Sequence, residues 1–151
     1  ALGPLLARVE AEAAALSGGR DDLRFDDRVD AVQIAGNEGE LASAIGNLVA
    51  NAVRYTPDGG KIAVTWRLDA GGGELTVTDT GIGIAPEHLP RLTERFYRVD
   101  RGRSREAGGT GLGLAIVKHV LERHQAALRV DSVPGEGSRF SVVFPPHRVQ
   151  S

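Results

Sequence analysis

Clustered glycines are the feature that most constrains how this chain can fold. The 151 residues include 20 glycines, nearly double the usual share of about 7%. Glycine tolerates the backbone conformations of tight turns, so a cluster marks a place where a helix or strand ends. The clusters divide the chain into short segments, and the segments between them carry the periodic patterns.

Three of these segments have apolar residues at helical spacing. The middle one is the clearest, because Leu41, Ile45 and Leu48 share a face and Pro57-Asp58-Gly59-Gly60 follows as a stop and turn. The first ends at Ser17-Gly18-Gly19. The sequence therefore predicts helices over residues 2–16, 38–55 and 112–124.

Other segments have the alternation and turn boundaries of strands. The expected strands are two short ones within 23–35 around a turn, a hairpin of 61–68 and 74–79, and a final pair over 127–133 and 138–144. A short helical turn is expected near 87–92, and the arginine- and glycine-rich segment 95–109 is typical of a mobile loop. One sheet with interspersed helices predicts an α/β (α+β) two-layer sandwich, a mixed sheet of about five strands covered on one face by three helices.

Composition excludes several classes of function. The chain has 18 basic and 20 acidic residues, a formal net charge of −2 and no cysteine. It therefore has no disulfide, thiolate nucleophile or cysteine-based zinc site. The charge argues against nucleic acid or anionic lipid as the main partner. No apolar run approaches the roughly 20 residues of a membrane helix, so we expect no membrane contact by these residues.

Asn47, Asn51 and Arg54 form a polar stripe on the middle predicted helix because they lie three or four residues apart. Asparagine is a poor helix former, so this choice of residues costs some stability. Either the stripe is simply an exposed face, or its amide oxygens are aimed at a hard cation such as Mg²⁺. Tyr55 at the end of the helix either packs in the core or lies flat against a planar ring.

Asp79 ends a predicted strand and precedes Thr80-Gly81-Ile82-Gly83. It is either a turn-capping aspartate or a carboxylate that recognises an amino group on a heterocycle, with the glycines allowing close approach. A calcium loop is excluded because the further acidic residues that such a loop needs are absent.

Gly108-Gly109-Thr110-Gly111-Leu112-Gly113 leads directly into the third predicted helix. Free backbone amides at a helix N-terminus suit phosphates, although the spacing fits neither a dinucleotide fingerprint nor a phosphate-binding loop ending in lysine. The loop before it contains five arginines, which either neutralise phosphates or form a solvated charge run: Arg95, Arg98, Arg101, Arg103 and Arg105. His119 and His124 are five residues apart, which does not align them as metal ligands, and we expect both at the surface or facing a partner.

In combination, these motifs resemble the sequence boxes of bacterial sensor histidine kinases. Residues 47–57 are similar to the N box, 79–84 to the first glycine box, 94–98 to the F box and 109–114 to the second glycine box, in family order. The resemblance covers about residues 23–144 and includes the closing segment 135–140. The excess of arginine over lysine is similar to that of actinobacterial sensor kinases.

The resemblance implies the ATP-binding Bergerat fold that these kinases share with gyrase, Hsp90 and MutL, with segment 95–109 as a mobile ATP lid. It implies that residues 21–151 form the catalytic domain and that residues 1–20 are the tail of a dimerisation and phosphoacceptor hairpin or a linker helix. Asp79 would bind the adenine amino group, and Asn47 and Asn51 would hold Mg²⁺. The ATP-binding residues that it implies are Asn47, Asn51, Arg54, Tyr55, Asp79, Gly81, Gly83, Ile84, Tyr97, Arg98, Gly109, Thr110, Gly111, Leu112, Gly113 and Ser138.

The implied activity is transfer of the ATP γ-phosphate to a histidine on a separate helical hairpin, for relay to a response-regulator aspartate. In hydrolytic members of the superfamily a glutamate that activates water stands at the position of Asn47. The side chain of Asn47 is an amide, which cannot act as a base near neutral pH. Thr93 stands where the F box often has phenylalanine, which implies looser lid packing. The acceptor-like run His88-Leu89-Pro90-Arg91 lies between two boxes and is rejected, so the chain is not expected to phosphorylate itself.

The implied partners are the kinase's own hairpin domain and a cognate response regulator. The implied setting is the cytoplasmic part of a membrane-anchored homodimer, with the chain alone a monomer. Three alternatives stay open: a serine kinase of the anti-sigma-factor type, a non-enzymatic nucleotide-sensing module, and a nucleic-acid binder, which the net charge and few aromatics disfavour.

Overall fold

The computed structural model describes residues 2–18, 22–25, 32–56, 59–69, 72–81, 113–133 and 135–150. The helices are α1 (Leu2–Ser17), α2 (Glu38–Tyr55), α4 (Gly113–Arg123) and the short 3-10 helix η2 (Pro146–Arg148). The strands are β1 (Asp22–Phe25), β2 (Gln33–Ile34), β3 (Lys61–Asp69), β4 (Gly72–Asp79), β5 (Ala127–Val133), β6 (Gly137–Phe144) and β7 (Val149–Gln150). The helical turn predicted near 87–92 and the loop predicted over 95–109 lie outside the described residues.

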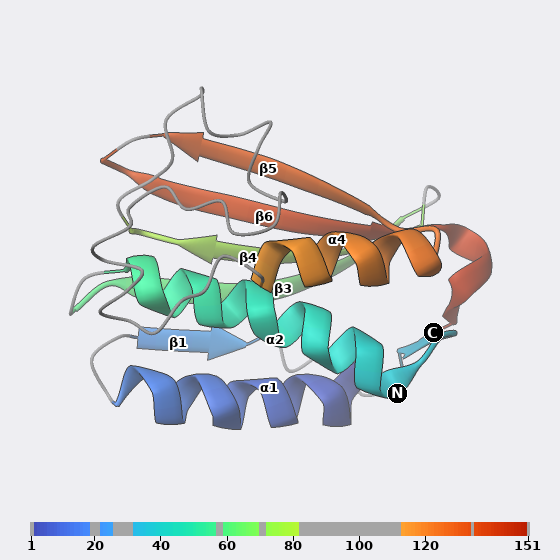
Figure 1. Ribbon diagram of the computed structural model, residues 1–151, viewed down its shortest axis with the longest axis horizontal. Coiled ribbons are helices and arrows are strands. Elements are labelled where there is room, and N and C mark those ends of the chain that lie inside the picture. Colours follow the sequence, from blue (N-terminus) through green and yellow to red (C-terminus); the bar gives the residue numbers. More distant parts are fainter. Residues whose placement is uncertain are drawn as a thin grey trace.

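Five strands form the main sheet in the order β1-β3-β4-β6-β5. The first pair is parallel and the other three pairs are antiparallel. Figure 1 shows α1, α2 and α4 side by side over one face of this sheet, with α2 in the middle. The predicted two-layer sandwich with a mixed five-stranded sheet and three helices is therefore confirmed. Along the described residues, no helix combines the length and apolar character needed to cross a membrane.

The first helix packs into the domain core. Its apolar face, which includes Leu2, Leu6 and Val9, is buried in the same cluster as the apolar face of α2. The helix ends at the predicted glycines, where Gly18 adopts a φ of 63° and donates to the Ala14 carbonyl at 3.0 Å. The assignment of residues 1–20 to a hairpin tail or linker helix stays a prediction, but any such role has to be compatible with this burial.

The two short strands predicted within 23–35 are present, but they belong to different sheets. β1 lies at the edge of the main sheet, parallel to β3, whereas β2 pairs antiparallel with β7. The small sheet is extended by a bond from the Ala35 amide to the Arg148 carbonyl at 2.7 Å. The guanidinium of Arg148 donates back to the Ala35 carbonyl at 2.8 Å. The segment before α2 is thus held by residues far away in the sequence.

Helix α2 has a well-defined start and a largely buried body. Asn37 caps it by accepting from the Glu40 amide at 2.9 Å, which satisfies one of the free donors of the first turn. Glu38 and Glu40 add negative charge where the helix dipole is positive. One face is buried in the core through Leu41, Ala44, Ile45, Leu48, Val49, Ala52 and Val53.

Candidate functional site

The inner face of the sheet changes from apolar to polar at one end. Alternate residues of a strand share a face, so Leu75, Val77 and Asp79 of β4 point to the same side, and the first two are fully buried. Val77 pairs across the sheet with Phe140 of β6. One step further along, Asp79 pairs with Ser138. The carboxylate therefore stands at the edge of the core, where an apolar side chain would continue the pattern.

Asp79 is a buried carboxyl group with two backbone donors. Its exposed fraction is 6%. Its Oδ1 accepts from the Gly81 amide at 2.9 Å, and the Ser138 amide also bonds to the carboxyl group. Burial raises the pKa of Asp79 above its ordinary value, while the two amide bonds act in the opposite direction. The site therefore contains a carboxylate that is less well solvated than in water and would gain from a further donor.

Serine hydroxyls extend this polar row across the next strands. The Ser138 hydroxyl lies 2.9 Å from that of Ser132, which also donates to the Gly137 carbonyl at 3.0 Å. Ser138 is buried. The prediction from sequence included Ser138 but missed Ser132, although the alternation of Leu128, Val130 and Ser132 placed a polar residue where an apolar one would continue the face.

Glycine is required where β6 begins beside Asp79. Gly137 has a φ of 138°, and a Cβ built there would lie 2.1 Å from the Asp79 carbonyl oxygen. On the other side, Thr80 and Lys61 exchange two bonds, one from the Thr80 amide to the Lys61 carbonyl at 3.1 Å and one from the Lys61 amide to Thr80 Oγ1 at 2.9 Å. Close backbone packing thus fixes the turn that follows the carboxylate.

The polar stripe of α2 is a partly open edge beside the buried face of the helix. Asn47, Asn51 and Arg54 are all half-buried. The amide nitrogen of Asn47 donates to the Ser43 carbonyl at 2.7 Å. Only the nitrogen of the amide can donate to a carbonyl, so Asn47 Oδ1 is the atom left to accept or to ligate. Amide oxygens of this kind fit Mg²⁺, which takes few protein ligands and keeps several waters.

Helix α4 begins at Gly113, close to the predicted start, and packs beside α2. Its first turn presents backbone amides without intrahelical partners, as every helix N-terminus does. Gly81 is buried next to Asp79. Tyr55 is the last residue of α2. The remaining predicted site residues lie outside the described residues: Gly83, Ile84, Tyr97, Arg98, Gly109, Thr110, Gly111 and Leu112.

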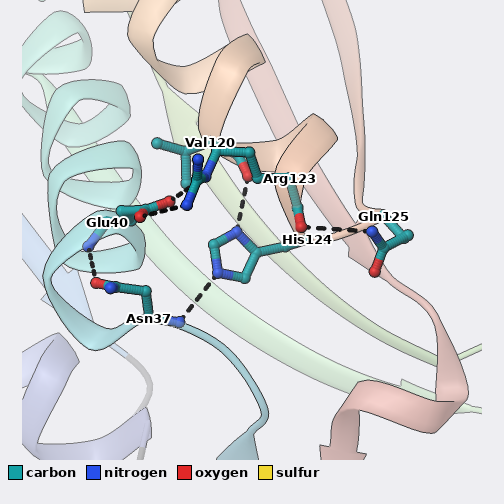
Figure 2. Close-up of polar contacts among 6 residues, drawn as sticks. All are labelled: Asn37, Glu40, Val120, Arg123, His124 and Gln125. Atoms are coloured by element: carbon teal, nitrogen blue, oxygen red, sulfur yellow. Dashed lines mark hydrogen bonds and ion pairs between the residues drawn. The ribbon is translucent and has the colours of Figure 1, made fainter.

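His119 is exposed, in agreement with the expectation, but the expectation for His124 was wrong because its side chain is 4% exposed. Figure 2 shows its ring between the end of α4 and the start of α2. Nε2 accepts from the Asn37 amide at 3.0 Å, and Nδ1 lies 2.8 Å from the Val120 carbonyl. Since Nε2 has to accept, Nδ1 carries the proton. The sequence did contain a signal, because His124 continues the apolar stripe of Val117, Val120 and Leu121.

Comparison with known proteins agrees with the fold and with the motifs. The family described as histidine kinase-, DNA gyrase B- and HSP90-like ATPase matches residues 36–148. The phosphate regulon sensor protein PhoR of Pseudomonas aeruginosa is 57% identical over 149 residues, which are 99% of this chain and 34% of that protein. The sensor-like histidine kinase SenX3 of Mycolicibacterium smegmatis is 50% identical over 115 residues, which are 76% of this chain and 30% of that protein. The chain thus spans about a third of the length of these curated relatives.

Solved structures give the same result. The mycobacterial sensor histidine kinase MprB superposes with a TM-score of 0.80 and 28% identity, covering 95% of both chains. Full-length ShkA, solved in complex with AMPPNP, superposes with a TM-score of 0.80 and 28% identity over 96% of this chain and 30% of that one. The match over residues 36–148 shows that the chain belongs to the histidine kinase-, DNA gyrase B- and HSP90-like ATPase family, as a catalytic ATP-binding domain of the sensor histidine kinase type.

Proposed function

We propose that this domain binds ATP together with Mg²⁺ and transfers the γ-phosphate to a histidine on a separate helical hairpin domain. A response-regulator aspartate is the next acceptor. The observation that carries the proposal is the buried carboxyl group of Asp79 at the end of β4, which accepts from the Gly81 and Ser138 amides and lies beside the hydroxyls of Ser138 and Ser132.

Adenine fits this carboxylate because its exocyclic amino group can supply a hydrogen-bond donor in addition to the amides of Gly81 and Ser138. Asp79 does cap the following turn through the Gly81 amide. An aspartate with that role alone is expected at the hydrated surface, whereas Asp79 is 6% exposed in the core-facing row. A hydrogen bond to a buried charged group is worth about 1.5–3 kcal/mol. Gly81 has no side chain that would stand between a ring and the carboxylate, and Ser138 borders the same end of the sheet.

The metal and phosphate part of the site is formed by α2 and α4. Asn51 and Asn47 would hold Mg²⁺ through amide oxygens, and Arg54 adds positive charge at the end of the same helix. The amides of the first turn of α4, which begins at Gly113, would receive the phosphates. When bound, Mg²⁺ neutralises developing charge on the phosphate oxygens, and most of the remaining catalysis in phosphoryl transfer is positioning.

The side chain at position 47 favours transfer over hydrolysis. Asn47 is an amide, which has no basic group near neutral pH and so cannot take a proton from water. ATP bound here would persist until the acceptor histidine arrives. We propose accordingly that the domain belongs to the cytoplasmic part of a membrane-anchored homodimer, and that the chain alone is a monomer. Its partners would be the hairpin domain and the response regulator.

Calorimetric titration of ATP in the presence of Mg²⁺ tests the binding half of the proposal. Asp79→Asn should weaken binding about 10- to 150-fold, which is the equivalent of the 1.5–3 kcal/mol above. Asp131→Asn is the matched control because it removes an exposed carboxylate on β5. GTP should bind poorly, since its ring presents an oxygen where adenine presents the amino group. Equal binding of ATP by the protein and by Asp79→Asn would refute the assignment of the base site.

A transfer assay tests the catalytic half. A purified helical hairpin domain that contains a phosphoacceptor histidine serves as acceptor for the phosphate of γ-labelled ATP. Acid-labile label on the hairpin, and none on this chain, is the expected result. Label on this chain would show that an acceptor is present in it, and ATP binding without transfer would favour a nucleotide-sensing module.

A further inference from the structure

A network of polar contacts joins the end of α4 to the start of α2. His124 accepts from the Asn37 amide across 87 residues of sequence. Arg123, the preceding residue, forms two bonds with the Glu40 carboxylate at 2.9 and 3.1 Å. Asn37 in turn caps α2, because its side-chain oxygen accepts from the Glu40 backbone amide. Figure 2 shows these four side chains together, and we call them the α2–α4 clasp: Asn37, Glu40, Arg123 and His124.

The clasp lies at the C-terminal end of α4 (Figure 2), and Gly113 lies at the N-terminal end of the same helix. Figure 1 shows α4 running antiparallel to α2, with its end near the start of α2. Gly113 precedes His124 by 11 residues, or roughly 16 Å at 1.5 Å per residue. Counted in the opposite direction from Asn37, the same length reaches about residue 48 of α2. The first turn of α4 is therefore brought alongside about residues 45–48 of α2, which include Asn47, and Asn51 lies three residues further along α2.

The clasp is well suited to fix this axial register. A slip of one residue would move the two helices by about 1.5 Å, and would break both the bond to the Asn37 amide and the two-bond contact with Glu40. The His124 ring is also enclosed from the other side, since a Cβ at Gly36 would lie 2.4 Å from its Cδ2. Apolar packing between two helices opposes their separation. It opposes sliding of one helix along the other less strongly, because it is not directional.

We propose that His124 is a positioning residue for the phosphate and metal part of the site, acting through the register of α4 on α2. This inference rests on the proposed function, since it assigns the phosphates to α4 and the metal to α2. Adenine recognition by Asp79 belongs to the sheet and does not depend on that register. The inference therefore predicts that loss of the clasp weakens binding of the phosphates with Mg²⁺ and spares binding of the base.

Two substitutions separate the contacts of the ring. His124→Gln places an oxygen near the position of Nε2, where it can accept from the Asn37 amide. His124→Asn is shorter and retains only the bond to the Val120 carbonyl. His119→Asn, at an exposed position of the same helix, is the matched control. For each variant, calorimetry measures the affinity for ATP with Mg²⁺, and an NMR titration measures the affinity for adenosine.

The expected result is a change in the ratio of the two affinities. His124→Asn should lose about 2- to 30-fold in affinity for ATP with Mg²⁺, the range of long-range coupling by residues that touch no ligand, while adenosine binding stays unchanged. His124→Gln should restore most of the ratio, and His119→Asn should leave it as it is. An equal loss for both ligands would indicate a merely structural role and overturn the inference, as would an unchanged ratio.

Arg123→Gln decides the matter if His124→Asn does not fold. It removes the ion pair with Glu40, which is partly exposed, and leaves the buried ring in place. The same selective loss is expected, up to about 5-fold because exposed pairs are worth at most about 1 kcal/mol. A ratio equal to that of the unmodified protein would overturn the inference. Failure of the unmodified protein to bind ATP would instead overturn the proposed function, so the two failures are distinguishable.

Discussion

Asp79→Asn should gain stability relative to the unmodified, nucleotide-free domain as the pH rises from 3.8 toward neutrality, while it weakens the base site. Burial raises the pKa of Asp79 in the folded protein above its ordinary value of 3.8. A group whose pKa is raised by folding contributes most to stability below its unfolded pKa, and this contribution is lost as the pH rises through the folded pKa. The amide of asparagine does not titrate, so in the variant the contribution of residue 79 to the free energy of unfolding does not change over the same pH interval.

The size of the effect follows from linkage. Between pH 3.8 and the folded pKa, the free energy of unfolding of the variant should rise relative to that of the unmodified protein by up to about 1.4 kcal/mol per pH unit. Above the folded pKa the difference should be constant. Any cost of fitting the amide beside the amides of Gly81 and Ser138 is independent of pH, so the slope isolates the carboxyl group.

Urea unfolding from pH 3.5 to pH 7, followed by circular dichroism, measures this difference. Other carboxylates titrate in the same range, but they are common to both proteins and cancel in the subtraction. Asp131→Asn shows how much slope the loss of one exposed carboxylate produces. ATP with Mg²⁺ at 100 times the Kd of the unmodified protein should add about 2.7 kcal/mol to that protein and only about 0.3–1.4 kcal/mol to the variant, whose affinity is about 10- to 150-fold lower. The difference should therefore shift by about 1.3–2.4 kcal/mol in favour of the unmodified protein. A difference that is flat, or that falls as the pH rises, would refute the reasoning.

Three further outcomes can be checked with the same instruments. Gly137→Ala should destabilise the domain by about 3 kcal/mol or more, because its Cβ would meet the Asp79 carbonyl oxygen at 2.1 Å. Gly135→Ala is the control, because its Cβ would enter open space and the change should cost only about 1 kcal/mol of backbone strain. Equal losses of stability in the two variants would be inconsistent with the clash. Gln125→Gly should relieve the strain of a positive φ of 53° and so raise the free energy of unfolding by about 1 kcal/mol. The gain should be seen mainly in an Arg148→Ala background, because in the unmodified protein Arg148 bonds to the Gln125 side chain. A strictly additive double-mutant cycle would contradict this coupling. Removal of Mg²⁺ by EDTA should weaken ATP binding, and isothermal titration that finds no change would remove the asparagines from the metal site.

Local pattern was sufficient to predict most of the secondary structure. Helix α2 matches its predicted bounds because the apolar stripe and the stop signal agree, and in the structure the Asn37 cap fixes its start. The hairpin of β3 and β4 was predicted from two apolar strands around glycines. Asp79 was predicted as a candidate site because it ended a strand before glycines, but its burial and its serine neighbours depend on the pairing of β4 with β6, which sequence alone did not specify.

The misplaced features depend on contacts between distant segments. Strand β2 has two residues, too few for any periodicity, and its partner lies at the other end of the described chain. His124 was expected at the surface because its distance from His119 was considered, and its position on the apolar stripe was not. A polar residue on such a stripe is buried only when a distant group satisfies it, and here that group is the Asn37 amide.

The small sheet of β2 and β7 has a consequence for the order in which the domain is completed. Ala35 and its partner Arg148 are 113 residues apart in the sequence. At 5–20 residues per second, a ribosome needs roughly 6–23 s to make that interval. During this time the entry to α2 has no partner strand, and long-range pairing of this kind is slow to form. A nascent chain should therefore hold the entry to α2 in its final position only after Arg148 has been made.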